Sequence, residues 1–478
     1  MARQNKLVGL MLTLSISIIR IGMGYFISVA GPILLHLADN VGVSVGTVSY
    51  IFVGGSIGVV IGSIFGAVMR RRMNPKFRHL YTFGFAAFLL GTTSPVVPFI
   101  KSLWLLFLIY LIGGIVYGYL DAGLQALILK LWNEKSSRSH IQLFNFTYSI
   151  GAFAAPLIAK QMQEMYGDIP STAASKCQHQ KIENSSLASR PYLNSTVDNT
   201  SMIEVDDRGL RWTYYTLAIW MLPVSILMMF LAYNDVEEKI LRFNREKSSN
   251  SGSTIVRDDP FKDVVFILIA VAGYYFCSVG METVFYSFIY SVTFCSDLGF
   301  TPAQASYANS LVWLGLGIGR LSGVVFAKRV QPRTIVFCCI AGTTIDSFIM
   351  SVFGEQTALV TWIVAFTHGL TTSTLYPAGV SWLSQVTNVS GAYMFIFNLG
   401  SALGSLTMLP LAGHLFDKNP FNAIHLVLAL SVSNGVFFAL ALLAARFFKR
   451  KVQKKALEMT NQVKTSTEND FMMPRDRD

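Results

Sequence analysis

Residues 234–262, NDVEEKILRFNREKSSNSGSTIVRDDPFK, form a charged, serine-containing stretch between two strongly apolar halves of the chain. Six long apolar segments precede this stretch and six follow it. Each segment reaches the ~20 residues that an α-helix needs to cross the ~30 Å hydrocarbon core of a bilayer. The segments cover residues 8–35, 45–69, 79–100, 102–131, 140–160, 212–233, 263–294, 302–327, 334–354, 357–383, 389–415 and 422–447.

This pattern predicts an all-α membrane protein whose twelve transmembrane helices form two six-helix lobes. We expect an N-terminal lobe in residues 1–233, a cytoplasmic linker in 234–262, a C-terminal lobe in 263–447 and a cytoplasmic tail in 448–478. Two such lobes are a common plan of secondary transporters. Hydrophobic residues make up 52% of the chain and charged residues only 14%, with a mean hydropathy of +0.48, which excludes an ordinary soluble domain.

The basic residues indicate which ends of the helices face the cytoplasm. The net charge is +11, and the Lys and Arg residues gather after the second, fourth, eighth and twelfth segments. No Lys or Arg lies between Leu37 and Val45, in a loop of the other side. Because cytoplasmic loops carry the excess of Lys and Arg, both termini are predicted to be cytoplasmic. We expect the basic residues to contact membrane lipid, and we expect no nucleic-acid partner.

The long loop 161–211 is predicted to be extracellular. The loop contains three sequons for N-linked glycosylation. Glycans are added on the lumenal side, so these sequons indicate passage through a secretory compartment and a plasma-membrane location. Two further matches, at Asn145 and Asn388, lie in or beside predicted helices near the cytoplasmic side, and we interpret them as chance. The predicted glycosylation sites are Asn184, Asn194 and Asn199.

The five cysteines predict no disulfide framework, because only Cys177 lies clearly on the extracellular side. A Cys177–Cys295 bridge remains an alternative. The chain also lacks zinc-ligand spacing and a phosphate-binding glycine loop after a strand, since the run GLGIGR at 315–320 belongs to a predicted membrane helix. We therefore expect no enzyme activity, no metal site and no cofactor.

Polar residues form a stripe on the fourth segment. Tyr117, Asp121 and Gln125 are spaced by four residues, so they share one helix face. Gly114 and Gly118 lie on the same side and would allow close approach of the substrate or of another helix. An ionisable side chain at membrane depth costs ~2.5–3.5 kcal/mol on insertion scales. We interpret Asp121 as a residue of a substrate cavity or of a coupling-ion site, and a structural carboxylate paired with a basic group is the alternative.

The seventh segment repeats this spacing with Ser278, Glu282, Tyr286 and Tyr290. Hydroxyl, carboxylate and aromatic groups on one face suit a polyol, whose hydroxyls need donors and acceptors and whose ring carbons pack on aromatic rings. Glu282 is the second candidate for the coupling ion. The aromatic residues alone are weaker indications, because such stripes more often serve packing.

Four further ionisable residues lie within predicted helices. Arg20 is expected to pair with Asp121, although holding a substrate hydroxyl or facing water are alternatives. Arg320 is interpreted as a gate or an interdomain lock. Asp346 has no obvious partner in the sequence and receives no role. His368 could titrate, bind substrate or be a hydrogen-bonded structural histidine.

The two halves share a faint repeat. FNFTYSIGAFAAP begins at Phe144 and FNLGSALGSLTMLP begins at Phe397, with a Phe-Asn pair, a later glycine and a proline in each. Corresponding helices interrupted by glycine and proline are typical of segments that bend around a central site. The predicted substrate-binding residues are Tyr117, Asp121, Gln125, Asn145, Glu282, Tyr286, Tyr376 and Asn398.

Several motifs together make the chain resemble the major facilitator superfamily and, within it, the sodium-dependent glucose transporter branch related to fucose permeases. The resemblance covers most of 13–160 and 263–415 and excludes the sequon-bearing loop and the tails. Its motifs are SVAGPILLHLADN (28–40), SYIFVGG (49–55), YLDAGLQALILKLW (119–132), FNFTYSIGAFAAPLIAK (144–160), SVGMETVFYSFIYS (278–291), LYPAGVS (375–381) and residues 400–410.

The resemblance implies a two-lobed fold with helices one, four, seven and ten around a central cavity, sugar transport, and sodium coupling at the acidic positions Asp121 and Glu282. The chain departs from the family pattern in having Gln125 for Asn, Gly55 for Arg, and Met-Arg-Arg-Arg at 69–72 in place of an Asp-Arg pair. Since one membrane arginine is lost and Arg20 is present, we hypothesise that the positive charge has moved between neighbouring helices.

The leading functional hypothesis is a secondary active transporter that moves a glucose-like monosaccharide across the plasma membrane by alternating access, coupled to sodium. The expected partners are a small-molecule sugar, sodium or a proton, and membrane lipid. Two alternatives stay open. One is a proton-coupled or uncoupled carrier of another small neutral solute, and the other is a carrier fold that acts as a non-transporting sensor.

Overall fold

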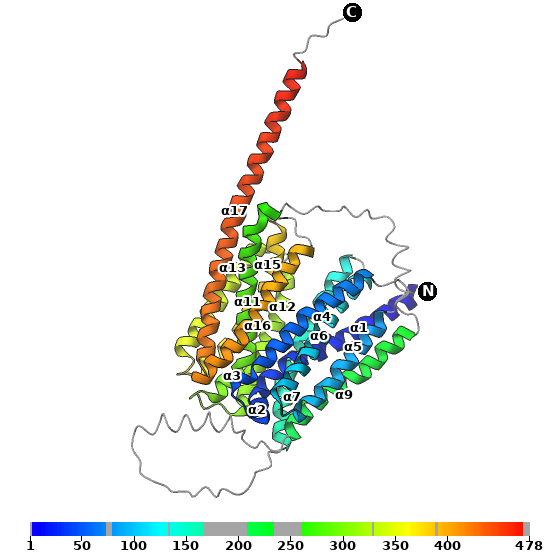
Figure 1. Ribbon diagram of the computed structural model, residues 1–478, viewed down its shortest axis with the longest axis vertical. Helices are drawn as coiled ribbons and strands as arrows, with labels where there is room; N and C mark the ends of the chain where they lie inside the picture. Colours follow the sequence, from blue (N-terminus) through cyan, green and yellow to red (C-terminus); the bar gives the residue numbers. More distant parts are fainter. Residues whose placement is uncertain are drawn as a thin grey trace, which may run out of the picture.

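The computed structural model describes residues 2–72, 79–131, 134–166, 208–233, 261–326, 329–387 and 391–471. These residues form helices joined by short turns, and the described part contains no strand. Figure 1 shows two groups of helices side by side, with α17 extending far beyond the others. The predicted glycosylation sites, Cys177, Asn388 and almost all of the linker 234–262 lie outside the described residues.

Each predicted apolar segment corresponds to helix in the structure, and the first six form the N-terminal lobe. Its elements are α1 (Ala2–Ser28), α2 (Ala30–Val41), α3 (Val45–Val48), α4 (Tyr50–Arg72), α5 (His79–Thr93), the 3-10 helix η1 (Ser94–Phe99), α6 (Leu103–Leu131), α7 (Glu134–Tyr166) and α9 (Arg208–Tyr233).

The other six segments form the C-terminal lobe. Its elements are α11 (Phe261–Cys295), α12 (Pro302–Phe326), α13 (Pro332–Phe353), α14 (Ala358–Thr372), α15 (Leu375–Ser384), α16 (Gly391–Lys418) and α17 (Asn422–Phe471). The all-α fold with twelve membrane segments is therefore confirmed. Helix α17 continues well beyond the predicted segment end at 447.

Ten helical stretches of the described residues are long and apolar enough to cross a membrane. The two that fall short of this composition are α7 and α12, which carry more polar residues. These two helices pack against each other, one from each lobe. Part of the surface of each helix therefore faces the other lobe, where a polar side chain meets protein and not hydrocarbon.

Proline residues split two of the predicted segments into shorter helices. The first segment divides into α1 and α2 at Val29, and the tenth divides into α14 and α15 at Ser373. Pro32 and Pro377 lack the N–H that would bond the carbonyl four residues earlier, so the chain bends just before each proline. Both bends lie beside the space between the lobes.

Glycines allow helices within a lobe to approach at backbone distance. An added Cβ at Gly118 would meet the backbone of Val59 in α4, and one at Gly114 would meet the backbone of Gly55. The predicted close approach at Gly114 and Gly118 is thus confirmed, with α4 as the neighbour. Large apolar side chains such as Trp104 and Phe266 remain exposed on the outside, where a bilayer would cover them.

Cys295, at the end of α11, is disulfide-bonded. The other cysteines that the structure describes, Cys277, Cys338 and Cys339, are free. The favoured expectation of no disulfide is therefore wrong. The alternative, which gave Cys295 a disulfide bond, is correct for Cys295. Spacing along the chain could not reveal this, because it does not show which distant cysteines the fold brings together.

Candidate functional site

A cavity of about 1870 Å³ lies between the two lobes. It exceeds the ~300–1,000 Å³ of a typical closed small-molecule site, so it is an open vestibule. Its lining reaches Gly323, Pro332 and Ser381, at the ends of α12, α13 and α15. These ends lie on the side from which α17 extends in Figure 1, so the cavity reaches that face of the molecule. The first, fourth, seventh and tenth predicted segments all contribute to its walls.

At the opposite end the two lobes touch. The backbone N–H of Gly46 in α3 donates to both carboxylate oxygens of Asp417 in α16, at 3.1 and 3.0 Å. Tyr50 Oη lies 3.3 Å from His414 Nε2, and their rings meet edge to face with centroids 5.7 Å apart. We call the contact of Gly46, Tyr50, His414 and Asp417 the α3–α16 latch. It joins the lobes at the end where the cavity is closed.

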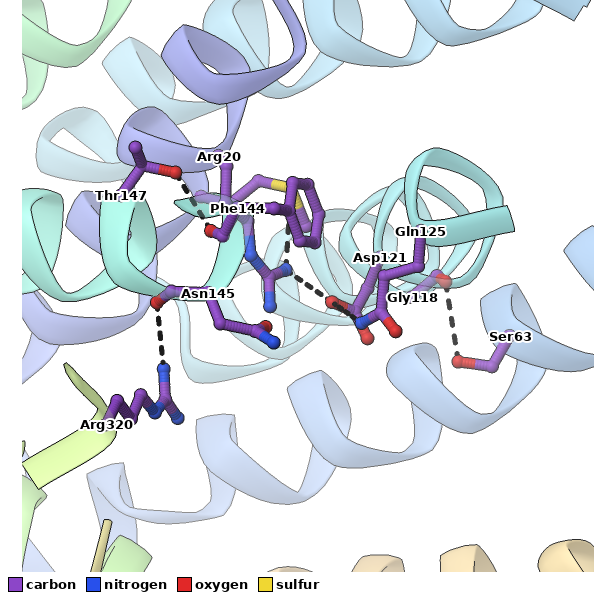
Figure 2. Close-up of polar contacts among 10 residues, drawn as sticks. Arg20, Ser63, Gly118, Asp121, Gln125, Phe144, Asn145, Thr147 and Arg320 are labelled. Atoms are coloured by element: carbon purple, nitrogen blue, oxygen red, sulfur yellow. Dashed lines mark hydrogen bonds and ion pairs between the residues drawn. The ribbon is translucent and has the colours of Figure 1, made fainter. Parts of the chain in front are cut away.

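Arg20 of α1 and Asp121 of α6 form an ion pair beside the cavity, as Figure 2 shows. Asp121 Oδ1 also accepts a hydrogen bond from Gln125 Nε2 at 3.3 Å. The guanidinium of Arg20 lies over the rings of Phe144 and Tyr148, at 4.4 and 4.9 Å from their centroids. Arg20 is buried, whereas the Asp121 side chain is 32% exposed. The carboxylate therefore faces the cavity, and the arginine neutralises it from behind.

Arg320 connects the two lobes inside the cavity wall. Its Nη1 donates to the backbone oxygen of Asn145 in α7 at 3.2 Å, a contact that is visible in Figure 2. The guanidinium also lies 5.4 Å from the centroid of the Tyr148 ring. Tyr148 consequently lies near two guanidinium groups, that of Arg20 from its own lobe and that of Arg320 from the other.

Glu282 of α11 lines the cavity without a fixed partner. Among the described residues its carboxylate takes part in no hydrogen bond and no ion pair, and Arg320 is the cationic group close enough to act on it electrostatically. One turn further along α11, Tyr286 Oη lies 2.5 Å from Thr372 Oγ1 of α14. The two predicted acidic residues therefore differ, because Asp121 is paired and Glu282 is free.

The remaining predicted substrate contacts also lie on this cavity. Tyr376 of α15 donates to Asn398 Oδ1 of α16 at 2.6 Å. Tyr117 and Asn145 line the N-terminal lobe. All eight residues that were predicted as substrate contacts thus border one cavity, although they come from five helices.

Two of the other polar residues lie away from the cavity. The Asp346 carboxylate accepts hydrogen bonds from Thr367 at 2.8 Å and Thr371 at 3.2 Å, so it links α13 to α14. His368 is fully buried against the Phe285 ring, with the two ring centroids 4.1 Å apart. The partners of Asp346 were missed because they belong to the next helix and not to its own.

Sequence reasoning predicted Tyr286 but missed the two aromatic residues Tyr148 and Trp313, which also line the cavity. Trp313 of α12 lines the cavity between Tyr148 of the N-terminal lobe and Tyr286 of its own lobe. The i, i+4 spacing of Asn309 and Trp313 on a predicted membrane helix was the available signal, because a polar side chain in such a helix needs a partner.

Comparisons with known sequences bear on this two-lobed cavity. The family model of the Major Facilitator Superfamily matches residues 16–405 and, in a second match, residues 272–469. The chain is 30% identical to sodium-dependent glucose transporter 1 of Danio rerio, over 87% of this chain and 67% of the relative. It is 27% identical to sodium-dependent glucose transporter 1A of Mus musculus, over 91% of this chain and 97% of the relative.

Solved structures show the same architecture. The xylose transporter XylE from E. coli, in a partially occluded inward-open conformation, matches with a TM-score of 0.60 and 14% identity, over 92% of this chain and 98% of that one. A bacterial homologue of the human lysosomal transporter Spinster matches with a TM-score of 0.62 and 12% identity, over 91% and 96%.

These relatives are transporters, and the chain is a multi-pass membrane protein and not an enzyme. The resemblance that the motifs carried is confirmed, including the similarity to the sodium-dependent glucose transporters. Because the family model matches most of the chain, the protein belongs to the Major Facilitator Superfamily.

Proposed function

We propose that the protein is a secondary transporter that carries a glucose-like monosaccharide across the plasma membrane, coupled to sodium. The observation that carries the proposal is the cavity wall. Two carboxylates, Asp121 and Glu282, are balanced by two guanidiniums, Arg20 and Arg320, and the rest of the polar wall consists of amides and hydroxyls. Such a wall suits a neutral solute with many hydroxyl groups. The names of the similar sugar transporters support the same substrate class.

Alternating access is the transport mechanism that the geometry favours. The cavity reaches one face of the molecule, while the α3–α16 latch holds the lobes together at the other end. If the lobes rock about the central site, the latch opens and the opposite ends of the helices close. The bends before Pro32 and Pro377 lie next to the cavity, where such a motion needs local flexibility.

Glu282 is the carboxylate best placed to bind a coupling cation, because no side chain of the described residues already holds it by a hydrogen bond or ion pair. Asp121 would contribute only if Arg20 released it. A membrane potential of ~60 mV supplies about 1.4 kcal/mol per charge. A tenfold sodium gradient supplies about 1.4 kcal/mol more, so one sodium per sugar supports roughly hundredfold accumulation.

The proposed orientation places the termini in the cytoplasm. Disulfides persist in oxidising compartments, so the bonded Cys295 supports an extracellular position for the end of α11. The sequons of loop 161–211 and the basic residues of the alternate loops support the same orientation. We propose the plasma membrane as the location, since passage through the secretory pathway is a route to it.

A proton-coupled carrier is the second candidate. A single free carboxylate such as Glu282 can take up a proton as readily as it can bind sodium. The cavity architecture and the sugar-like chemistry of the wall would be the same. The two candidates therefore differ only in which cation gradient drives uptake.

Uptake into proteoliposomes tests the proposed function. We expect labelled glucose to enter, with uptake rising at least severalfold when an inward sodium gradient replaces choline at fixed pH. Unlabelled glucose should compete. If uptake is the same in choline but follows an inward proton gradient, the coupling ion is the proton and not sodium. If no monosaccharide is taken up, the proposal of sugar transport is contradicted.

The variant Glu282→Gln tests the coupling site. The amide keeps the size of the side chain but cannot carry the charge that attracts a cation, so we expect sodium-driven uptake to fall at least tenfold while thermal stability is preserved. Glu355→Gln, which changes an exposed carboxylate in the turn after α13, is the matched control. Full sodium stimulation in Glu282→Gln would contradict the assignment.

Removal of Arg20 should destabilise the protein through Asp121. Breaking a buried ion pair typically costs ~3–5 kcal/mol, and the partial exposure of Asp121 to the cavity reduces this to about 1–3 kcal/mol. We expect Arg20→Met to lower the melting temperature in detergent and Arg20→Met/Asp121→Asn to recover most of it. Arg333→Met, at an exposed position, is the control. A fully stable Arg20→Met protein would show that the pair contributes little.

The α3–α16 latch yields a test of alternating access. Asp417→Ala removes the acceptor of the Gly46 N–H, and a carboxylate at a helix N-terminus contributes ~0.3–1 kcal/mol. The reporter is a cysteine in place of Ser287, which lines the cavity. We expect this cysteine to react with an impermeant maleimide added outside roughly two- to fivefold faster in the Asp417→Ala protein than in the protein that keeps Asp417. Asp297→Ala, at an exposed aspartate after α11, is the control. An unchanged rate in Asp417→Ala would count against the latch.

A further inference from the structure

We propose that Trp313 contacts the substrate, with its indole face supporting the apolar face of a pyranose ring, and that Asn309 holds the indole in place. The inference rests on the proposed function and names a residue of the same site. Neither residue was expected from the sequence, and neither carries charge. They are a contact residue and a positioning residue, respectively.

Trp313 occupies the end of the cavity where the two lobes meet. Its ring centroid is 4.6 Å from that of Tyr286 in α11, with the planes at 60°. It is 6.1 Å from that of Tyr148 in α7, with the planes at 71°. All three residues line the cavity. They therefore form an aromatic roof, defined by Tyr148, Tyr286 and Trp313, to which both lobes contribute.

Asn309 fixes the orientation of the indole. Trp313 Nε1 donates to Asn309 Oδ1 at 3.1 Å, and Asn309 Nδ2 donates to the backbone oxygen of Tyr286 at 3.2 Å. Asn309 is fully buried. Because the single polar group of the indole is satisfied inside the lobe, the surface left for a ligand is the apolar ring.

The N-terminal lobe packs directly on this arrangement. An added Cβ at Gly31 of α2 would lie 2.9 Å from Asn309 Nδ2 and 3.3 Å from the Tyr286 oxygen. Trp313 is only 4% exposed in this conformation, since Tyr148 and Tyr286 cover it. Tyr148 belongs to the other lobe, so rocking of the lobes separates it from Trp313. The sugar ring takes the place of Tyr148 against the indole.

The composition of the cavity explains why one aromatic platform matters. Its other proposed contacts, such as Gln125, Glu282 and Asn398, are hydrogen-bonding groups that recognise hydroxyls. Such groups also bind the hydroxyls of a flexible open-chain polyol. A flat apolar surface favours the cyclic sugar, because the ring presents a flat face of C–H groups. Trp313 therefore selects the pyranose form.

The experiment compares D-glucose with sorbitol, which has the same carbon chain and the same configuration at C2 to C5, but no ring and one more hydroxyl. Aromatic contacts of this kind correspond to a roughly two- to tenfold change in affinity. In Trp313→Leu we expect the KM for glucose to rise by this factor, with a smaller change in kcat. Any affinity for sorbitol, measured as inhibition of glucose uptake, should stay unchanged. Trp313→Phe, which keeps an aromatic face, should recover most of the wild-type KM.

Fluorescence of the purified protein supplies a second readout. Glucose should change the tryptophan emission of the wild type, and this change should be lost in Trp313→Phe. The matched control is Trp382→Phe, because Trp382 is equally buried in the C-terminal lobe but packs on Phe438 and does not line the cavity. That variant should keep the glucose-dependent change.

Asn309→Leu tests the positioning role. It should raise the KM for glucose in the wild-type background but not in the Trp313→Leu background, because the two side chains act as a unit. If Asn309→Leu only destabilised the protein, the melting temperature would fall in both backgrounds, and the effect on the KM would not depend on Trp313.

An unchanged KM for glucose in Trp313→Leu, or a persistent fluorescence response in Trp313→Phe, would overturn the inference alone. A wild-type protein that binds no monosaccharide would overturn the proposed function and the inference with it. The two failures are therefore distinguishable.

Discussion

Charged side chains inside the bilayer must be balanced by opposite charges, and this requirement determines how the helices around the cavity are arranged. A lone ionised side chain at membrane depth is costly, so each of the charged groups around the cavity needs compensation. Arg20 and Asp121 satisfy this need within the N-terminal lobe by direct pairing. Arg320 and Glu282 satisfy it across a longer distance within the C-terminal lobe. This looser arrangement leaves the Glu282 carboxylate without a hydrogen bond or ion pair among the described residues, and the proposed coupling site rests on this difference between the lobes.

The arrangement of the lobes around these charges is compatible with the proposed alternating access. Arg320 donates to the backbone of Asn145, so the C-terminal lobe contacts the N-terminal lobe at the depth of the site. The α3–α16 latch joins the lobes again at the closed end. Because the lobes contact each other at two levels, the contact at one level can open while the contact at the other level persists. The aromatic roof lies between these levels and belongs to both lobes.

Much of this architecture could be predicted from the sequence, because hydrophobic length and i, i+4 spacing are local properties. The stripe of Tyr117, Asp121 and Gln125 placed three cavity residues correctly on one face of α6. The partners of Asp346 and the environment of Trp313 could not be predicted, since both depend on which helix packs alongside. The split of the first segment at Val29 was also missed, because the apolar pattern continues through Pro32. The bonded state of Cys295 likewise depends on contacts between distant segments.

The proposed coupling is measured by the equilibrium binding of glucose to the purified protein at constant ionic strength while sodium replaces choline. If a sodium ion at Glu282 strengthens glucose binding, glucose must strengthen sodium binding by the same factor. We expect the Kd for glucose to fall as sodium rises. We also expect sodium to bind more tightly when glucose is present. A Kd for glucose that does not change with either sodium or pH would contradict the coupling of the two ligands at this site.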